Sequence, residues 1–243
     1  MAPNSDEQSI PQQRGRISHL LLRVADVDRA ARFYGALFSW QFERGQLPGY
    51  VEQRAVVGSG SAASSIRAAF IDDASAPPVR VEFAVEEPSL ALARTLQLGG
   101  TGNAAAACDD QGVPLAFAAR KRQDAQPAEA VQAGQIAVVI FDVPDTTKAR
   151  AFHTGLFGRT YHQIGSGDRW WIDGHAVGIF GAPASGVRFW CVVTALEPAI
   201  AEVARLGGCA VERGSMGPYQ VCDCRDDQGT QFGLWYDSNL RFA

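Results

Sequence analysis

Four polar side chains in the first half of the sequence could together bind an anion or a polar ligand. His19 and Arg23 lie in an apolar run at residues 17–24, and Arg80 and Glu82 lie in a second run at 79–85. If both runs are strands, alternation places these side chains on the face opposite to the large apolar residues. Arginine binds carboxylates through two hydrogen bonds, and histidine titrates near neutral pH. The alternative is that Arg80 and Glu82 only pair with each other and that His19 is a satisfied polar residue.

The second half of the sequence offers a more apolar candidate pocket. Alternation along the runs at 136–143, 187–193 and 230–236 selects five side chains with binding potential: Asp142, Arg188, Trp190, Gln231 and Trp235. Aromatic walls with a few polar groups are typical of ligand pockets. The alternative is that the two tryptophans simply fill a hydrophobic core.

The two halves correspond because the sequence repeats itself. FYGALF at residues 33–38 recurs as FHTGLF at 152–157, and LGG at 98–100 recurs at 206–208. The tetrapeptide DDQG at 109–112 recurs identically at 226–229. Three matches in the same order predict a duplicated module. We therefore expect a disordered lead-in at 1–15, modules at 16–122 and 134–243, and a polar linker at 123–133.

Each module shows the same order of predicted elements. A strand is followed by a helix that Asp26 or Asp145 caps, and short glycine-punctuated strands come next. A second strand then leads into helices at 88–98 and 198–206, each with proline at its start and glycine just beyond its end. Two further strands joined by DDQG as a hairpin turn close the module. The pattern predicts two β-α-β-β-β units per module.

Composition narrows the class of protein. The chain has 243 residues, 47% of them hydrophobic and 20% charged, which is typical of a globular protein. Its net charge of −4 argues against a nucleic-acid partner. No apolar run reaches the roughly 18–20 residues of a membrane span, and the first residues lack the apolar core of a secretory signal. Five cysteines without a CxxC pair favour a reducing compartment, so we expect a cytoplasmic protein.

These motifs in this order resemble the vicinal oxygen chelate superfamily, which includes glyoxalases, extradiol dioxygenases and bleomycin-binding proteins. The residues that carry the resemblance in the first module are His19, Leu22, Val24, Asp26, Ala30, Phe33, Tyr34, Leu37, Phe38, Leu96, Gly99, Gly100, Asp109, Asp110 and Gly112. The resemblance implies an α+β fold of two tandem glyoxalase-like modules. In each module a pair of βαβββ units would form a curved mixed sheet around a cavity.

The resemblance also implies four cavity-facing positions that chelate a divalent metal in the metalloenzymes. Carried over to the first module, these positions hold His19, no acid or histidine among residues 66–70, Arg80 and Ala116. In the second module they hold Val138, no clear acid near 177–180, Arg188 and Gly233, with His175 near the second position. A divalent cation needs several converging nitrogen or oxygen ligands. We therefore expect no metal cofactor, with His19 the one ligand-type residue that remains.

We therefore expect a small-molecule-binding protein without metal, a monomer or homodimer that binds neither nucleic acid nor membrane. One alternative is a metal-dependent glyoxalase-type lyase or isomerase, or a dioxygenase. Another is a structural duplication with no active cavity. The sequence leaves open whether the chain is an enzyme and which ligand it binds.

Overall fold

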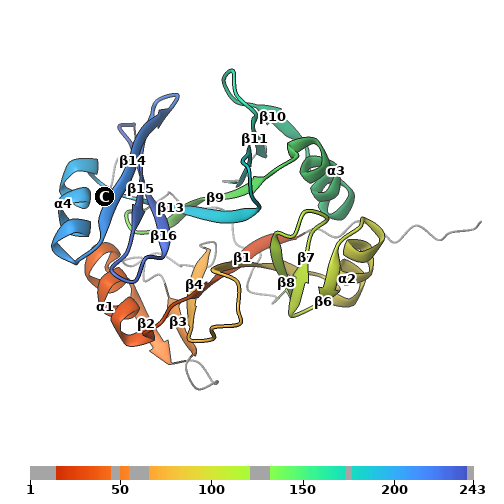
Figure 1. Ribbon diagram of the computed structural model, residues 1–243, viewed down its shortest axis with the longest axis horizontal. Coiled ribbons are helices and arrows are strands. Elements are labelled where there is room, and N and C mark those ends of the chain that lie inside the picture. Colours follow the sequence, from red (N-terminus) through yellow and green to blue (C-terminus); the bar gives the residue numbers. More distant parts are fainter. Residues whose placement is uncertain (1–14, 45–49, 55–65, 121–131, 173–176, 240–243) are drawn as a thin grey trace, which may run out of the picture.

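The computed structural model describes residues 15–44, 50–54, 66–120, 132–172 and 177–239, with the backbone alone for residues 44 and 50–54. Within these residues the chain forms four helices and two eight-stranded mixed sheets. Each sheet is built from one half of the chain (Figure 1). The predicted α+β fold of two tandem modules is therefore confirmed. The exact limits of lead-in, modules and linker stay predictions, since most of residues 1–15 and 123–133 lie outside the described residues.

The first half contains two βαβββ units that meet at the centre of one sheet. Its elements are β1 (Arg16–Arg23), α1 (Val27–Phe38), β2 (Gln41–Arg44), β3 (Tyr50–Arg54), β4 (Arg67–Ile71), β5 (Val79–Val85), α2 (Pro88–Gln97), β6 (Thr101–Asn103), β7 (Ala106–Cys108) and β8 (Pro114–Ala119). The strand order is β2-β3-β4-β1-β5-β8-β7-β6. The central strands β1 and β5 are antiparallel, whereas β4 runs parallel to β1 and β8 parallel to β5.

The second half repeats this topology. Its elements are β9 (Ile136–Val143), α3 (Thr146–Phe157), β10 (Tyr161–Gln163), β11 (Arg169–Ile172), β12 (Val177–Gly181), β13 (Gly186–Val192), α4 (Leu196–Arg205), β14 (Cys209–Met216), β15 (Tyr219–Arg225) and β16 (Gln231–Asp237). The strand order is β10-β11-β12-β9-β13-β16-β15-β14. Strands β9 and β13 take the central places of β1 and β5, as the duplication predicts.

Two edge strands and one helix start differ from the sequence prediction. The β-α-β-β-β order includes strands β6 and β14, but their residues were not located, because their side chains are almost all exposed and show no apolar alternation. Helix α4 begins at Leu196 rather than Pro198, so its proline is the third helical residue. Pro88 does stand at the start of α2, where its missing N–H group costs nothing.

The first helix of each module forms for the same local reason. The Asp26 carboxylate accepts a hydrogen bond from the backbone N–H of Arg29, and the Asp145 carboxylate accepts from Thr147 and Lys148. Such caps satisfy N–H groups that have no partner inside the helix. Each helix then buries an apolar stripe: Ala30, Phe33, Tyr34 and Phe38 in α1, and Ala149, Phe152, His153, Leu156 and Phe157 in α3.

The main hydrophobic core lies between the two sheets. Leu20 and Phe83 of the first sheet belong to the same buried cluster as Phe141 and Phe189 of the second sheet. Figure 1 shows α1 next to α4 on one side of the molecule and α2 next to α3 on the other. The sheets therefore stand back to back, and Leu20 faces the core between them, on the face opposite to His19. We call the face of each sheet that points away from this core its open face.

The two DDQG turns join one module to the other. The Gln228 amide accepts a hydrogen bond from the Asp26 N–H (2.7 Å) and donates to the Asp26 carbonyl (3.0 Å). Gln111 repeats this clasp on Asp145, at 2.8 and 2.9 Å. Each glutamine thus binds the backbone of the helix-capping aspartate in the other module. The prediction of a hairpin turn was right, but the turn also builds the interface between modules.

Candidate functional site

A row of four residues crosses the centre of the first sheet. In the strand register Arg67 of β4 lies beside His19, His19 lies beside Glu82 of β5, and Glu82 lies beside Ala116 of β8. The sequence analysis placed Arg80 at the third ligand position, and this prediction is wrong. Glu82 occupies the row, and Arg80 lies two residues away, beside Leu21. The row holds two ligand-type side chains rather than one.

His19 and Glu82 form a hydrogen-bonded pair on the open face. The Nδ1 atom of His19 lies 2.8 Å from Glu82 Oε1. A bulge between Ile17 and His19 turns Ser18 to the same side, and its hydroxyl donates to Glu82 Oε1 at 3.0 Å. Burial alone would raise the pKa of Glu82, but the bonds from His19 and Ser18 and the charge of Arg67 outweigh it and lower the pKa. Glu82 is therefore held as a carboxylate.

Two guanidinium groups flank this pair. Arg67 lowers the pKa of Glu82 by its charge, and its Cα lies opposite that of His19. Arg80 is half-buried and donates one hydrogen bond to the Ala105 carbonyl, at 3.1 Å. The alternative in which Arg80 pairs with Glu82 does not match this geometry, because Glu82 takes its bonds from His19 and Ser18. The sequence analysis did not predict a role for Arg67 or Ser18. It noted only that residues 66–70, which include Arg67, hold no acid or histidine.

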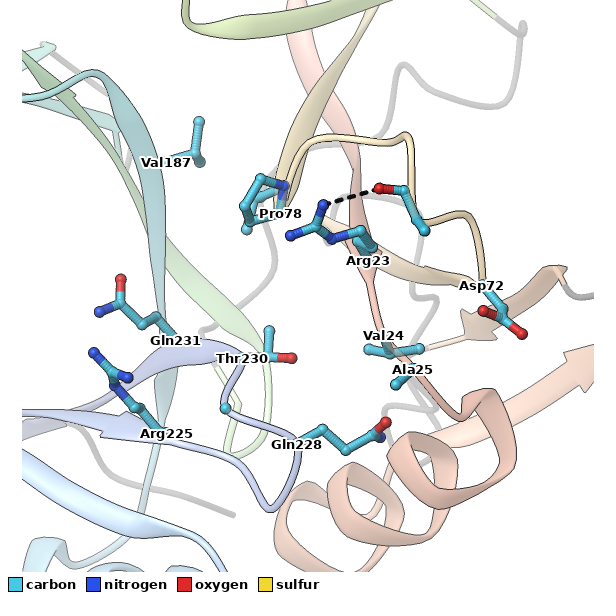
Figure 2. A pocket seen from close by; sticks show the side chains of 13 residues that line it. Arg23, Val24, Ala25, Asp72, Pro78, Val187, Arg225, Gln228, Thr230 and Gln231 are labelled. Carbon is cyan, nitrogen blue, oxygen red and sulfur yellow. Dashed lines mark hydrogen bonds between the residues drawn. The ribbon is translucent and has the colours of Figure 1, made fainter.

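Arg23 and Gln231 lie away from this pair. Arg23 ends β1, where its guanidinium donates to the carbonyl groups of Ala76 (2.9 Å) and Ala74 (3.3 Å). Gln231 begins β16 of the other module. Both line a cavity between the modules (Figure 2). The structure thus divides the predicted ligand residues among three places.

In the second sheet the corresponding row is filled by an indole ring. Val138 of β9 lies beside Trp190 of β13, and Trp190 lies beside Gly233 of β16. The position predicted for Arg188 is therefore held by Trp190. A Cβ atom added to Gly233 would lie 1.6 Å from Cδ1 of Trp190. Gly233 is required because Trp190, only 3% exposed, occupies the space beside it.

The polar groups around Trp190 are bonded to one another. Arg188 donates to both oxygens of Asp142, at 2.5 and 2.8 Å, and to Asp223 at 3.0 Å. Asp223 also accepts a hydrogen bond from Trp190 Nε1 at 2.7 Å. Burial alone would lower the pKa of Arg188, but the two carboxylates raise it. Asp223 was not predicted from the sequence, because its place beside Trp190 depends on the pairing of β15 with β16.

A cavity of about 210 Å³ remains beside this network, smaller than most ligand pockets. The Trp190 ring therefore packs in a hydrophobic core, which is the alternative to a ligand pocket that the sequence left open. The Trp235 ring lies 4.9 Å from the ring of Tyr219, and its Nε1 atom is buried without a hydrogen-bond partner among the described residues.

Comparison with known families agrees with this architecture. Residues 19–133 match the family model of the glyoxalase-like domain. The first module of this chain therefore resembles the glyoxalase-like family, and the match covers just under half of the chain. No curated protein matches the sequence.

Solved structures extend the likeness of this glyoxalase-like chain to both modules. A 2,3-dioxygenase from a Pseudomonas species has a TM-score of 0.64 and 12% identity, covering 93% of each chain. The Mn(II)-bound glyoxalase from Novosphingobium aromaticivorans has a TM-score of 0.64 and 11% identity, covering 95% of this chain and 87% of the other. Homoprotocatechuate 2,3-dioxygenase from Brevibacterium fuscum has a TM-score of 0.65 and 14% identity, covering 93% and 81%. At these identities the likeness shows the fold.

The donor set of this glyoxalase-like chain does not fit a divalent metal ion. In the first module the row supplies one imidazole and one carboxylate, and its other positions hold a guanidinium and a methyl group. In the second module the indole of Trp190 fills the row. Across the described part of the chain, no group of three or more His, Cys, Asp or Glu side chains could hold a metal. None of the described helices is long and apolar enough to span a membrane.

Proposed function

We propose that the open face of the first module binds a small organic molecule through carboxylate or carbonyl oxygens, without a protein-bound metal. The observation that carries this proposal is the His19–Glu82 pair with Arg67 and Arg80 on the same sheet. Two arginines and one carboxylate therefore surround the imidazole of His19 on this face. Such a face favours an anionic or carbonyl-rich ligand.

The side chains have distinct roles in this proposal. Arg80 uses one N–H group on Ala105 and has four more to donate, so it is the first candidate for a direct bond to ligand oxygen. Glu82 accepts from His19 and fixes the orientation of the imidazole ring.

A metal-dependent glyoxalase-type or dioxygenase activity is the second candidate. It is favoured by the placement of His19 and Glu82 in one row, because the row then holds two side chains that can bind a metal, whereas the sequence predicted only His19. Two further donors are lacking in this row, since Arg67 remains protonated and Ala116 has no donor atom. The third candidate, a duplication without an active cavity, predicts that neither metal nor small molecule binds. Oligomeric state and cellular location stay predictions.

The test combines elemental analysis with ligand screening of the purified chain. We expect less than about one tenth of a metal ion per chain, and a thermal-shift hit among small carboxylates and oxo acids. Arg80→Met should weaken binding of the hit by about tenfold to a hundredfold, since a bond from a charged donor is lost. Arg32→Met, an exposed change on α1, is the matched control.

Three outcomes would contradict the proposal. About one metal ion per chain that is lost in His19→Ala would establish the metal-dependent candidate. A ligand that binds Arg80→Met as tightly as the parent chain would show that Arg80 is only structural. A screen without any hit, in a folded and metal-free chain, would favour the structural duplication.

A further inference from the structure

A second cavity lies between the two modules, at the ends of strands rather than beside the central row of either sheet. It has a volume of about 590 Å³ and is lined by the end of β1, the β4–β5 connection, β13 and the β15–β16 turn. This volume lies within the range of small-molecule sites. His19 and Arg23 are four residues apart on β1, or about 13 Å along the strand. The cavity is therefore distinct from the His19–Glu82 face.

Two guanidinium groups from different modules line this cavity. Figure 2 shows Arg23 on one side and Arg225 with Gln231 on the other, with Thr230 between them in this view. Arg23 is held by the carbonyl groups of Ala74 and Ala76, which use one of its terminal nitrogens. Arg225 is exposed, and within the described residues its side chain has no hydrogen bond or ion pair. Both arginines can therefore donate further hydrogen bonds.

The rest of the lining is mixed in character. Val24, Val79, Val187 and Pro78 supply apolar surface, while Thr230 and Gln231 supply polar groups. Asp72 brings the one carboxylate of the lining, and Figure 2 shows it directed away from Arg23. Apolar walls beside two cations suit an organic anion better than a small inorganic one.

The duplication provides an internal comparison for this polar set. The repeat offsets relate Arg23 to Asp142, Arg225 to Cys108, Thr230 to Val113 and Gln231 to Pro114. At the second junction Asp142 is bonded to Arg188, and the other three positions lack a hydroxyl, amide or guanidinium group. The fold itself therefore does not require the polar set, because its other copy is built without it. The polar set occurs only at the junction of Arg23 with Arg225, so we expect it to serve a role other than folding.

We infer that this inter-module cavity binds a small organic dianion, of the dicarboxylate class, between Arg23 and Arg225. One carboxylate would bind the guanidinium of each module, and the hydrocarbon part would contact the valine side chains. The ligand would then bridge the modules beside the Gln228 clasp, and its binding would stabilise their association.

The probes are succinate, adipate and phthalate, with inorganic phosphate and the neutral compound phthalamide as comparison arms. Titration calorimetry on the full chain should show binding of at least one dicarboxylate and none of phthalamide. Arg225→Met should weaken that binding about tenfold to a hundredfold, and the charge reversal Arg225→Glu should abolish it. Arg32→Met should leave the affinity unchanged. A dicarboxylate whose binding is weakened by Arg80→Met and not by Arg225→Met would belong to the proposed function, so the two sites can be told apart.

Circular dichroism and an unchanged midpoint of unfolding should show that both Arg225 variants are folded. The inference is wrong if no dicarboxylate binds at concentrations up to about 10 mM. It is equally wrong if Arg225→Met and Arg225→Glu bind as the parent chain does. Phosphate binding as tight as the best dicarboxylate would overturn the organic part of the inference.

Discussion

A buried hydrogen bond across the two modules offers a sharp test of how they are held together. The Tyr34 hydroxyl donates to Asp226 Oδ2 at 3.1 Å, and the Tyr34 side chain is fully buried. Asp226 is also buried, and its other oxygen accepts from the backbone N–H groups of Gln228 and Thr230. Tyr34→Phe removes the hydroxyl donor and keeps the ring, which packs against Trp40 and Phe70.

The expected cost follows from the charge of the acceptor. A hydrogen bond to a charged group contributes about 1.5–3 kcal/mol, so Tyr34→Phe should lower the free energy of unfolding by about that amount. Burial raises the pKa of Asp226 above its ordinary value of 3.8, and the bond from Tyr34 works in the opposite direction. Without that bond the folded pKa rises further. The extra loss of stability should therefore be full above the folded pKa and should shrink as the pH falls toward 3.8.

Tyr161→Phe is the matched control. Its hydroxyl is also buried but has no hydrogen-bond partner among the described residues, so its removal should be neutral or slightly stabilising. The assay is urea unfolding of the parent chain and both variants over a pH series from about 8 down to 3.8. Equal stabilities of Tyr34→Phe and Tyr161→Phe at pH 8, or a cost for Tyr34→Phe that stays constant down to pH 3.8, would refute the reasoning.

Two further predictions concern stability. Gln228→Leu removes both hydrogen bonds to Asp26 and should cost about 1–3 kcal/mol in urea unfolding, whereas the exposed Gln231→Leu in the same hairpin should be near neutral. Equal effects of the two would contradict the clasp. Gly233→Ala should cost at least about 1–3 kcal/mol because its Cβ overlaps the Trp190 ring. The same change in a Trp190→Val background should cost much less, and a purely additive double-mutant cycle would disprove the overlap.

The sequence predicted the architecture because the repeat and the alternation are local signals. Leu20 and Phe83 face the core as expected, and His19 faces away from it. Strand β14 was missed because its residues are almost all exposed and show no alternation of apolar and polar side chains. Local patterns report burial, and they say little about an edge strand that has water on both faces.

The site was harder to predict because it depends on pairing between strands. The family resemblance placed Arg80 and Arg188 at the third ligand position, but the registers place Glu82 and Trp190 in the central rows. A shift of two residues keeps the face and changes the neighbour, so parity cannot detect it. Each central pair also has a register irregularity, between Ile17 and His19 in the first sheet. Spacing along the chain does not contain that information.

The two modules have diverged most where their fold leaves the choice free. The clasp is kept in both: Gln228 on Asp26 and Gln111 on Asp145, with one DDQG turn on each side of the interface. The central rows differ, because the first keeps a polar pair and the second is closed by Trp190. Contacts that join the modules are needed twice, once at each junction, whereas the proposed function needs its ligand site once. This division explains why the repeated motif lies at the interface and why the candidate binding residues are found in only one copy.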